Sequence, residues 1–376
     1  MANPTSGIAA NRLFFVDHLR AALIILVVLH HVAFISLLYS AEEPAYQSPV
    51  AFLLLLLLFL LVNQAYFMGL FFLISGYFTP GSFDRKGPAS YLKGRLLRLG
   101  IPTLIYMFIL SPIAGIGVIY QMPAAVTGIT TPLTWQQYPK LIGIGPMWFA
   151  VMLLVFEFGY VTWRMATKNR VEHAATDPVT PTYRTIAAFI LVLALANYLL
   201  RIVIPLGTYV FSFPTLSYLP QYISFFIIGI IALHRNWLQT IPNSMGKWGF
   251  RVALLSTLIL FPLALSGKSA FLGAGYWPSG AYALWDSIFS VGMCLGLITL
   301  FRRFFDRPGR LGWFLSQHAY AVYVFHFPVV VLLALALRGI HLEALLKFGL
   351  AAIVGVPLCF AVAYLVRKIP FMASIL

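Results

Sequence analysis

The sequence predicts an all-α polytopic membrane protein, a bundle of about ten transmembrane helices with both termini in the cytoplasm. Composition, a succession of apolar runs and the placement of Lys and Arg predict this class. Of the 376 residues, 61% are hydrophobic and only 9% are charged, against about 25% charged in soluble proteins. The mean hydropathy is +0.90. We expect one integral membrane domain over residues 1–376 and no separate soluble domain.

A transmembrane helix needs about 20 predominantly apolar residues. Ten such runs follow one another, near residues 19–39, 52–78, 99–119, 145–163, 186–205, 219–233, 249–266, 281–301, 318–337 and 345–366. The second run is long enough that its helix must tilt, kink or extend beyond the hydrocarbon, and the sixth is short. The first run is not expected to be a cleaved signal peptide, because it is long and Asp17 flanks it. Residues 166–184 are expected to form a loop between the fourth and fifth spans.

Lys and Arg residues orient the bundle, because cytoplasmic loops carry the excess of both. Of the 25 basic residues, nineteen fall on one alternate set of ends and loops, five fall on the opposite set, and Arg20 lies inside the first span. An odd number of spans would break this alternation. The count therefore supports ten spans with both termini cytoplasmic, in the cell membrane, or the inner membrane of a cell with two.

The net charge of +15 does not indicate nucleic acid, since the basic residues are scattered between apolar runs without interleaved aromatic residues. The two cysteines, Cys294 and Cys359, lie inside apolar runs. Neither a disulfide framework nor a thiolate metal site is expected, and no metal is assigned.

The first span carries Arg20, His30 and His31 in an apolar helix. At about 100° per residue, His31 lies ~20° from Arg20 around the helix and roughly 16 Å along it. His30 lies about 80° from Arg20 and is interpreted as a bystander. Asp17, three residues before Arg20, is placed to pair with it. The alternative is that Arg20 extends to the headgroups and both histidines only bond to neighbouring helices.

Five segments resemble the acyltransferase-3 family of integral membrane acyltransferases, in the same order along nearly the whole chain. They are RLFFVDHLRAALIILVVLHH at 12–31, FFLISGYF at 71–78, GRLLRLGIP at 94–102, GPMWFAVMLLVFE at 145–157 and HAYAVYVFHFPVV at 318–330. The arginine-to-histidine spacing and the paired arginines are the more specific features. Within the family, RLFFVDHLR and the late VRKIP are most similar to the glucan biosynthesis protein C branch, whose members place succinyl groups on periplasmic glucans.

The resemblance implies O-acyl transfer, of acetyl or succinyl class, from a coenzyme A thioester to a hydroxyl of an extracytoplasmic carbohydrate. Acyl-CoA is then a substrate, and no permanently bound cofactor is expected. The expected partners are the acyl-CoA donor, the carbohydrate acceptor and the lipid bilayer; nucleic acid is not among them. A separate protein that delivers the acceptor and a homo-oligomer both stay open.

A neutral histidine suits the deprotonation of an acceptor hydroxyl, and His31 is the expected general base. Arg95 and Arg98 are expected to bind the donor's phosphates, because guanidinium groups bind phosphate in bidentate fashion. Arg20 is placed to assist those phosphates or to direct the thioester carbonyl. A structural role for His31, and a purely topological role for Arg95 and Arg98, are the alternatives.

Further residues are expected to line the site. They are Asp17, Trp148, Glu157, Asp286 and His326. Glu157 is placed to pair with a basic residue or to tune a histidine, and Asp286 to bond acceptor hydroxyls near the outer end of the eighth span. Each of these carboxylates, and His326, has the alternative of plain helix pairing.

Two other classes of function remain open. A polytopic transporter of a glycan or small metabolite would use the buried charges, but the sequence has no inverted repeat or matched pair of Gly/Pro-broken segments. A membrane scaffold or sensor would tolerate replacement of Arg20 and His31.

Overall fold

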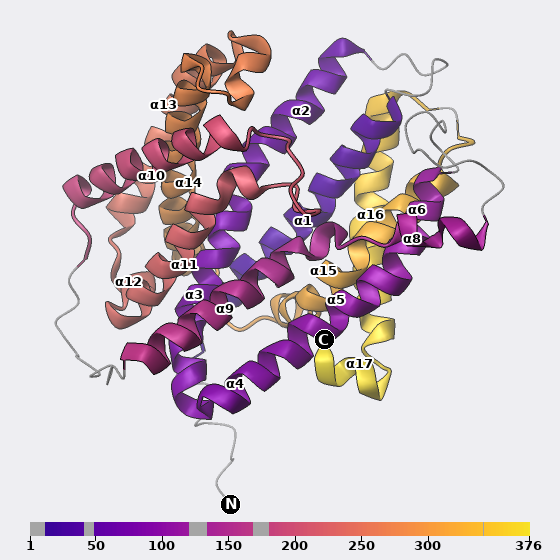
Figure 1. Ribbon diagram of the computed structural model, residues 1–376, viewed down its shortest axis with the longest axis horizontal. Coiled ribbons are helices and arrows are strands. Elements are labelled where there is room, and N and C mark those ends of the chain that lie inside the picture. The colour runs from indigo at the N-terminus through magenta and orange to yellow at the C-terminus, as the bar shows by residue number, and fades with distance from the viewer. Residues whose placement is uncertain (1–11, 41–48, 120–133, 168–179, 341) are drawn as a thin grey trace, which may run out of the picture.

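The computed structural model describes residues 12–40, 49–119, 134–167, 180–340 and 342–376, and these residues are predominantly helical (Figure 1). Within these described ranges, ten helical segments are long and apolar enough to cross a membrane, at Phe14–Leu38, Val50–Lys86, Pro88–Ile119, Trp135–Thr167, Tyr183–Val203, Leu216–His234, Asn243–Leu265, Trp277–Phe304, Arg310–Ala336 and Ala344–Val366. Within the described residues there is no strand, only an isolated bridge between Val210 and Phe213. The prediction of an all-α polytopic bundle is confirmed.

Most helices are longer than the apolar runs that predicted them. The longer helices are α1 (Phe14–Ser40), α9 (Trp148–Thr167), α10 (Tyr183–Val203), α11 (Leu219–His234), α13 (Asn243–Leu265), α14 (Trp277–Phe304), α15 (Arg310–Ala336) and α16 (Ala344–Val366). Short elements join or follow them, namely η4 (Trp135–Gln137), α8 (Tyr138–Leu141), η5 (Gly145–Met147), η6 (Leu216–Tyr218), α12 (Trp237–Thr240), η7 (Lys268–Leu272) and α17 (Pro370–Ile375). Helices end where the backbone turns and not where hydrophobicity falls, so α15 begins eight residues before the predicted position 318. Most of the expected 166–184 loop lies outside the described residues.

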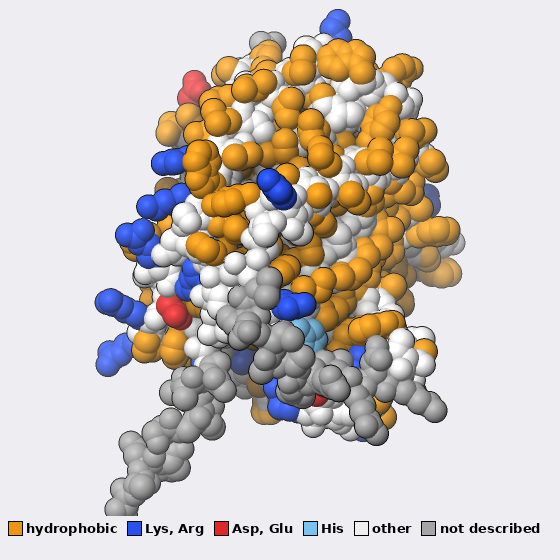
Figure 2. Space-filling model, turned by 90° about the vertical axis from the view of Figure 1, so that its left-hand side faces the viewer, with side chains coloured by type: hydrophobic (Ala, Val, Ile, Leu, Met, Phe, Trp, Pro, Cys, Tyr) orange, Lys and Arg blue, Asp and Glu red, His pale blue; other side chains and the backbone are white. Residues whose placement is uncertain are grey.

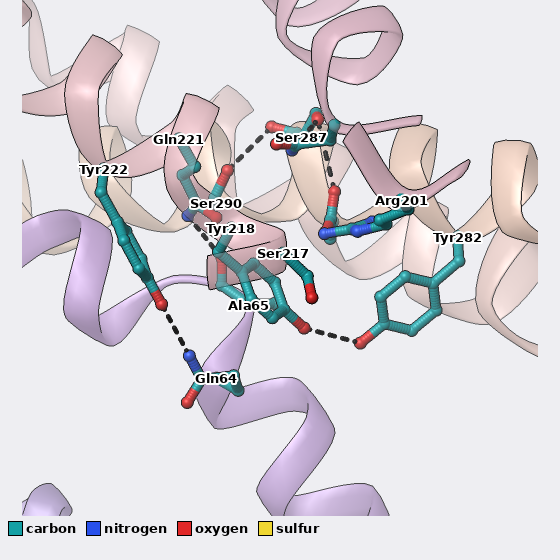
Figure 3. Close-up of polar contacts among 12 residues, drawn as sticks. Gln64, Ala65, Arg201, Ser217, Tyr218, Gln221, Tyr222, Tyr282, Ser287 and Ser290 are labelled. Carbon is teal, nitrogen blue, oxygen red and sulfur yellow. Dashed lines mark hydrogen bonds and ion pairs between the residues drawn. The ribbon is translucent and has the colours of Figure 1, made fainter. Parts of the chain in front are cut away.

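The second span is broken, as its length predicted. It consists of α2 (Val50–Gln64) and α3 (Phe67–Lys86), separated at Ala65 and Tyr66. The Gln221 side chain on α11 donates to the Ala65 carbonyl at 2.7 Å, and Gln64 donates to the Tyr222 hydroxyl at 2.9 Å (Figure 3). Irregular backbone at membrane depth is tolerated where protein groups satisfy it. The α11 side chains supply those groups here.

The third span contains α4 (Pro88–Arg95), α5 (Ile101–Ile105) and α6 (Ser111–Ile119), interrupted by π-helical turns at Leu96–Gly100 and Tyr106–Leu110. Pro102 and Pro112 have no N–H to donate to the carbonyls four residues earlier, those of Arg98 and Phe108. Tyrosine hydroxyls from other elements donate to both carbonyls: Tyr320 to Arg98 at 2.6 Å, and Tyr138 to Phe108. The π turns therefore occur where proline frees a carbonyl and a tyrosine captures it.

The helices that surround the site pack closely. The backbones of α3 and α11 approach at Gly76 and Gly229, where an added Cβ would lie 2.1 Å from the carbonyl oxygens of Phe226 and Leu73. Small residues allow such approach in membrane bundles. On the other side of the bundle, α1 packs along α15, which also contacts α16. These contacts fix α1, α3 and α15 around a shared interior.

Figure 1 shows α4, α12 and α17 toward one side of the bundle, which we call the basic side, and the connection between α13 and α14 toward the other. This arrangement agrees with the alternation of basic loops. Figure 2 shows a broad hydrophobic surface over one face, with Lys and Arg side chains concentrated along its left edge and lower end. The cytoplasmic position of both termini remains a prediction from this charge asymmetry.

Candidate active site

A cavity of about 740 Å³ lies between α1, α3, the third span, α9, α15 and the segment 204–215 that connects α10 to η6. The direction in which each helix crosses the bundle shows toward which side each lining residue lies. Toward the basic side it is lined by Arg20, Ser75, Phe78, Arg95, Arg98 and Tyr320; in the middle by His30, His31, Phe67, Met68 and Trp148; and toward the opposite side by Gln64, Gly143, Ile144, Gly145, Pro146, Tyr209, Ser212, Pro214 and Thr215. The cavity thus has a cationic end, a histidine-bearing middle and an uncharged polar end.

Arg95 is held in the cationic end by Glu157. The Arg95 Nη2 atom lies 3.2 Å from Glu157 Oε1, and Thr79 Oγ1 donates to the same carboxylate oxygen at 3.1 Å. Glu157 is fully buried on α9 and is not among the residues that line the cavity. The sequence expectation that Glu157 pairs with a basic residue matches this contact. Glu157 therefore fixes the position of Arg95 from behind.

Arg98 is positioned by Tyr320 of α15. The Tyr320 hydroxyl donates to the Arg98 carbonyl at 2.6 Å, and the Arg98 guanidinium lies 5.9 Å from the centre of the Tyr320 ring. Neither Arg98 nor Arg20 has an ion-pair partner among the described residues. These two guanidinium groups are therefore available to an anionic ligand in the cavity.

His31 and His326 form a pair whose tautomers follow from their backbone acceptors. A carbonyl can only accept, so His31 Nδ1 donates to the Val27 carbonyl at 2.9 Å, and His326 Nδ1 donates to the Tyr323 carbonyl at 2.7 Å. His326 Nε2 lies 3.2 Å from His31 Nδ1 and so accepts a share of the same proton. In neutral His31 the lone pair is then on Nε2, the nitrogen that a general base needs.

Two histidines differ from their expected positions relative to the cavity. His30 lines the cavity beside His31, with the two ring centres 5.5 Å apart. Its position about 80° from Arg20 around α1 does not exclude His30 from the lining, because the cavity is wide enough to contact both faces of the helix. His326 is fully buried behind His31 and does not line the cavity. It contacts the lining residues His31 and Tyr323.

The other predicted residues are distributed unevenly. Trp148 lines the cavity and stacks on Tyr222 with ring centres 5.5 Å apart. Asp17 forms an ion pair with Arg12 at 2.7 Å and no ion pair with Arg20. It lies outside the cavity lining, paired with Arg12 at the start of α1.

Asp286 also lies outside the cavity lining. Its carboxylate pairs with Arg201 at 2.5 Å, and both side chains are fully buried. The Arg201 guanidinium lies over the rings of Tyr218 and Tyr282, whose hydroxyl oxygens are 3.2 Å apart (Figure 3). Asp286 therefore joins α14 to α10 beside the segment 204–215.

Tyr320, Gln64 and the residues of 209–215 are cavity features that sequence reasoning missed. Tyr320 could have been found from Pro102, since a proline four residues after Arg98 implies a carbonyl that needs another donor. Gln64 offered a weaker signal as a polar residue within a long apolar run. The segment 209–215 offered none, because loops are placed by tertiary contacts.

Comparison with known proteins tests the family resemblance. A family model described as an acyltransferase domain matches residues 13–366. Proteins named Glucans biosynthesis protein C from Salmonella schwarzengrund (strain CVM19633) and Salmonella typhi are each 28% identical over 270 residues, which cover 68% of this chain and 67% of theirs. No solved structure matches this chain. The extent of the family match, over a multi-pass helical bundle, shows that the chain belongs to the acyltransferase-3 family of integral membrane acyltransferases.

Proposed function

We propose that this protein transfers an acyl group of acetyl or succinyl class from a coenzyme A thioester to a hydroxyl of an extracytoplasmic carbohydrate, with His31 as general base. The observation that carries the proposal is that one cavity contains Arg20, Arg95, Arg98 and His31 together. The names of the similar proteins, which refer to glucans, favour a glucan as the carbohydrate.

The cationic end suits the phosphates of coenzyme A. Arg20 and Arg98 have no ion-pair partner among the described residues, and Arg95 lies beside them. Guanidinium groups bind phosphate oxygens through two parallel hydrogen bonds. The thioester then extends along α1 for roughly 16 Å to reach His31, a distance that a pantetheine arm can span.

In the proposed reaction the acceptor hydroxyl oxygen attacks the thioester carbonyl carbon while His31 Nε2 takes the hydroxyl proton. The new C–O bond forms, the C–S bond breaks, and the proton passes to the leaving thiolate, so that free coenzyme A and an ester are produced. His326 is a positioning residue: its Nε2 accepts from His31 Nδ1–H and stabilises the imidazolium that forms. No permanently bound cofactor enters these steps.

The cavity's two ends imply opposite entry for the two substrates. If the basic side is cytoplasmic, as the Lys and Arg distribution predicts, acyl-CoA binds from the cytoplasm and the acceptor arrives from the other side, in the cell membrane or an inner membrane. Glu157 shapes the path between the two substrates by holding Arg95. Trp148 shapes it as part of the cavity wall. Non-helical backbone, such as that of the segment 204–215, is permitted at membrane depth where it lines a cavity.

Sealed vesicles of known orientation test the proposal. Acyl-CoA supplied only to the cytoplasmic face should acylate a glucose oligosaccharide enclosed on the other face, and His31→Ala vesicles with the same protein content should not. Transfer that requires both substrates on one face would refute the through-membrane route. Absence of any His31-dependent transfer from acyl-CoA would refute the assignment of donor and base.

A further inference from the structure

We propose that the segment 209–215, together with Gln64, is a binding site for a sugar ring of the acceptor, with Phe211 as its aromatic platform. The proposal rests on the proposed function for the identity of the reaction. It adds the place where the carbohydrate is held and the residue that holds it.

The tip of this segment has an unusual backbone. Val210 and Phe213 exchange backbone hydrogen bonds of 3.2 and 2.9 Å, which leaves Phe211 and Ser212 as the two residues of a tight turn. Both have positive φ, 49° for Phe211 and 66° for Ser212. Such turns favour Asn and Gly, and a bulky aromatic residue there is an outlier. Backbone strain of this kind concentrates at ligand clamps and active sites.

The turn presents its side chains while its base is anchored. Phe211 is 92% exposed and Tyr209 is 68% exposed, although both are aromatic. At the base, the Leu206 N–H donates to the Leu272 carbonyl at 2.8 Å, and Ser217 Oγ donates to the Pro205 carbonyl at 2.8 Å. The base of the segment is therefore anchored to the fold, while both aromatic side chains lie outside its core.

The same turn borders the cavity that contains His31. Tyr209 and Ser212 line the cavity's uncharged polar end, together with Thr215 and Gln64. Gln64 is itself oriented by its hydrogen bond to Tyr222 (Figure 3). A ligand held on the turn could therefore extend a hydroxyl into the cavity toward His31.

The chemistry of this end matches a neutral sugar. A pyranose ring has an apolar C–H face, which packs on an aromatic ring, and a rim of hydroxyls, which pair with amide and hydroxyl groups. Phe211 and Tyr209 supply the first, and Gln64, Ser212 and Thr215 supply the second. The arginines of the cavity all line the opposite end, so an anionic ligand is not favoured here.

The decisive variant is Phe211→Gly, because glycine accepts the positive φ without strain while the ring is removed. The matched control is Tyr276→Ala, which removes another exposed aromatic ring that does not line the cavity. The probe is a β-linked glucose pentasaccharide, added to the full-length protein in nanodiscs without donor. Hydrogen–deuterium exchange of residues 204–216 reports binding, and the KM for the pentasaccharide in acyl transfer reports use.

We expect the pentasaccharide to slow exchange at 204–216 in the wild type and in Tyr276→Ala, but not in Phe211→Gly. The KM for the pentasaccharide should rise about tenfold in Phe211→Gly, with the KM for acyl-CoA unchanged. No protection in the wild type would overturn the inference. Protection and a KM in Phe211→Gly equal to those of the wild type would also overturn it. This outcome includes the case in which Phe211→Gly changes only the association of the protein with lipid. Because hydrogen–deuterium exchange is measured without donor, its result is independent of whether His31-dependent acyl transfer occurs.

Discussion

The contact between His31 and His326 predicts different losses from two histidine substitutions. His31→Ala removes the proposed base, which typically contributes about 10²- to 10⁴-fold to rate. His326→Ala leaves His31 Nδ1–H with the Val27 carbonyl at 2.9 Å, so the tautomer is retained. Of the contacts of His31, it removes the acceptor at 3.2 Å, whose interaction strengthens when His31 becomes charged. That difference is about 1–2 kcal/mol, or roughly a five- to thirtyfold lower kcat.

The assay measures release of free coenzyme A thiol by purified protein, with acetyl-CoA or succinyl-CoA and a glucose oligosaccharide. The KM for the donor should be unchanged in both variants, because the proposed phosphate site is at the cationic end. His326→Gln should recover part of the rate, since its amide oxygen can accept from His31. His318→Ala is the matched control: His318 is buried on α15 and bonds to the Phe314 carbonyl, but it does not line the cavity. Equal losses in His326→Ala and His318→Ala would refute the reasoning.

Three further substitutions test separate parts of the site. Arg98→Lys keeps the charge but loses the planar fork, so the KM for acyl-CoA should rise about tenfold, whereas Arg164→Lys, at an ion pair with Asp84 outside the cavity, should leave that KM unchanged. Tyr320→Phe removes the donor to the Arg98 carbonyl, which should cost about 1–3 kcal/mol of stability and raise the KM for acyl-CoA with little change in kcat at saturation. Asp286→Asn leaves the buried Arg201 charge unpaired, and a loss of about 3–5 kcal/mol should lower the thermal unfolding temperature or the yield, with recovery in Asp286→Leu/Arg201→Met. An Asp286→Asn protein of normal stability that cannot use the acceptor would instead support a contact between Asp286 and the acceptor.

The sequence predicted the fold class, the number of spans and the residues that share the face of α1. These depend on hydrophobicity and helical period, which are local properties. The grouping of Arg20 and His31 in one cavity agrees with that period. The alternatives for His31 and the paired arginines stay open until the variants are measured.

The partners of the buried carboxylates were not predictable, because they depend on which helices meet. Glu157 had several basic candidates and meets Arg95, whereas Asp286 meets Arg201. Helix boundaries were missed for a related reason. Turns such as Ala65–Tyr66 are fixed by donors from α11, and no local pattern contains that information.

The two buried carboxylates also determine which arginines are free to bind an anionic ligand. Arg201 forms an ion pair with Asp286 and lies outside the cavity. Arg95 lines the cavity, but its charge is offset by Glu157 at 3.2 Å. Arg20 and Arg98 have no such carboxylate among the described residues, so the positive potential at the cationic end comes mainly from these two. An anionic donor should therefore lose more affinity when Arg20 or Arg98 is neutralised than when Arg95 and Glu157 are neutralised together, since the latter change removes no net charge. The opposite ranking would mean that the shape of the Arg95 contact, and not the charge, selects the donor.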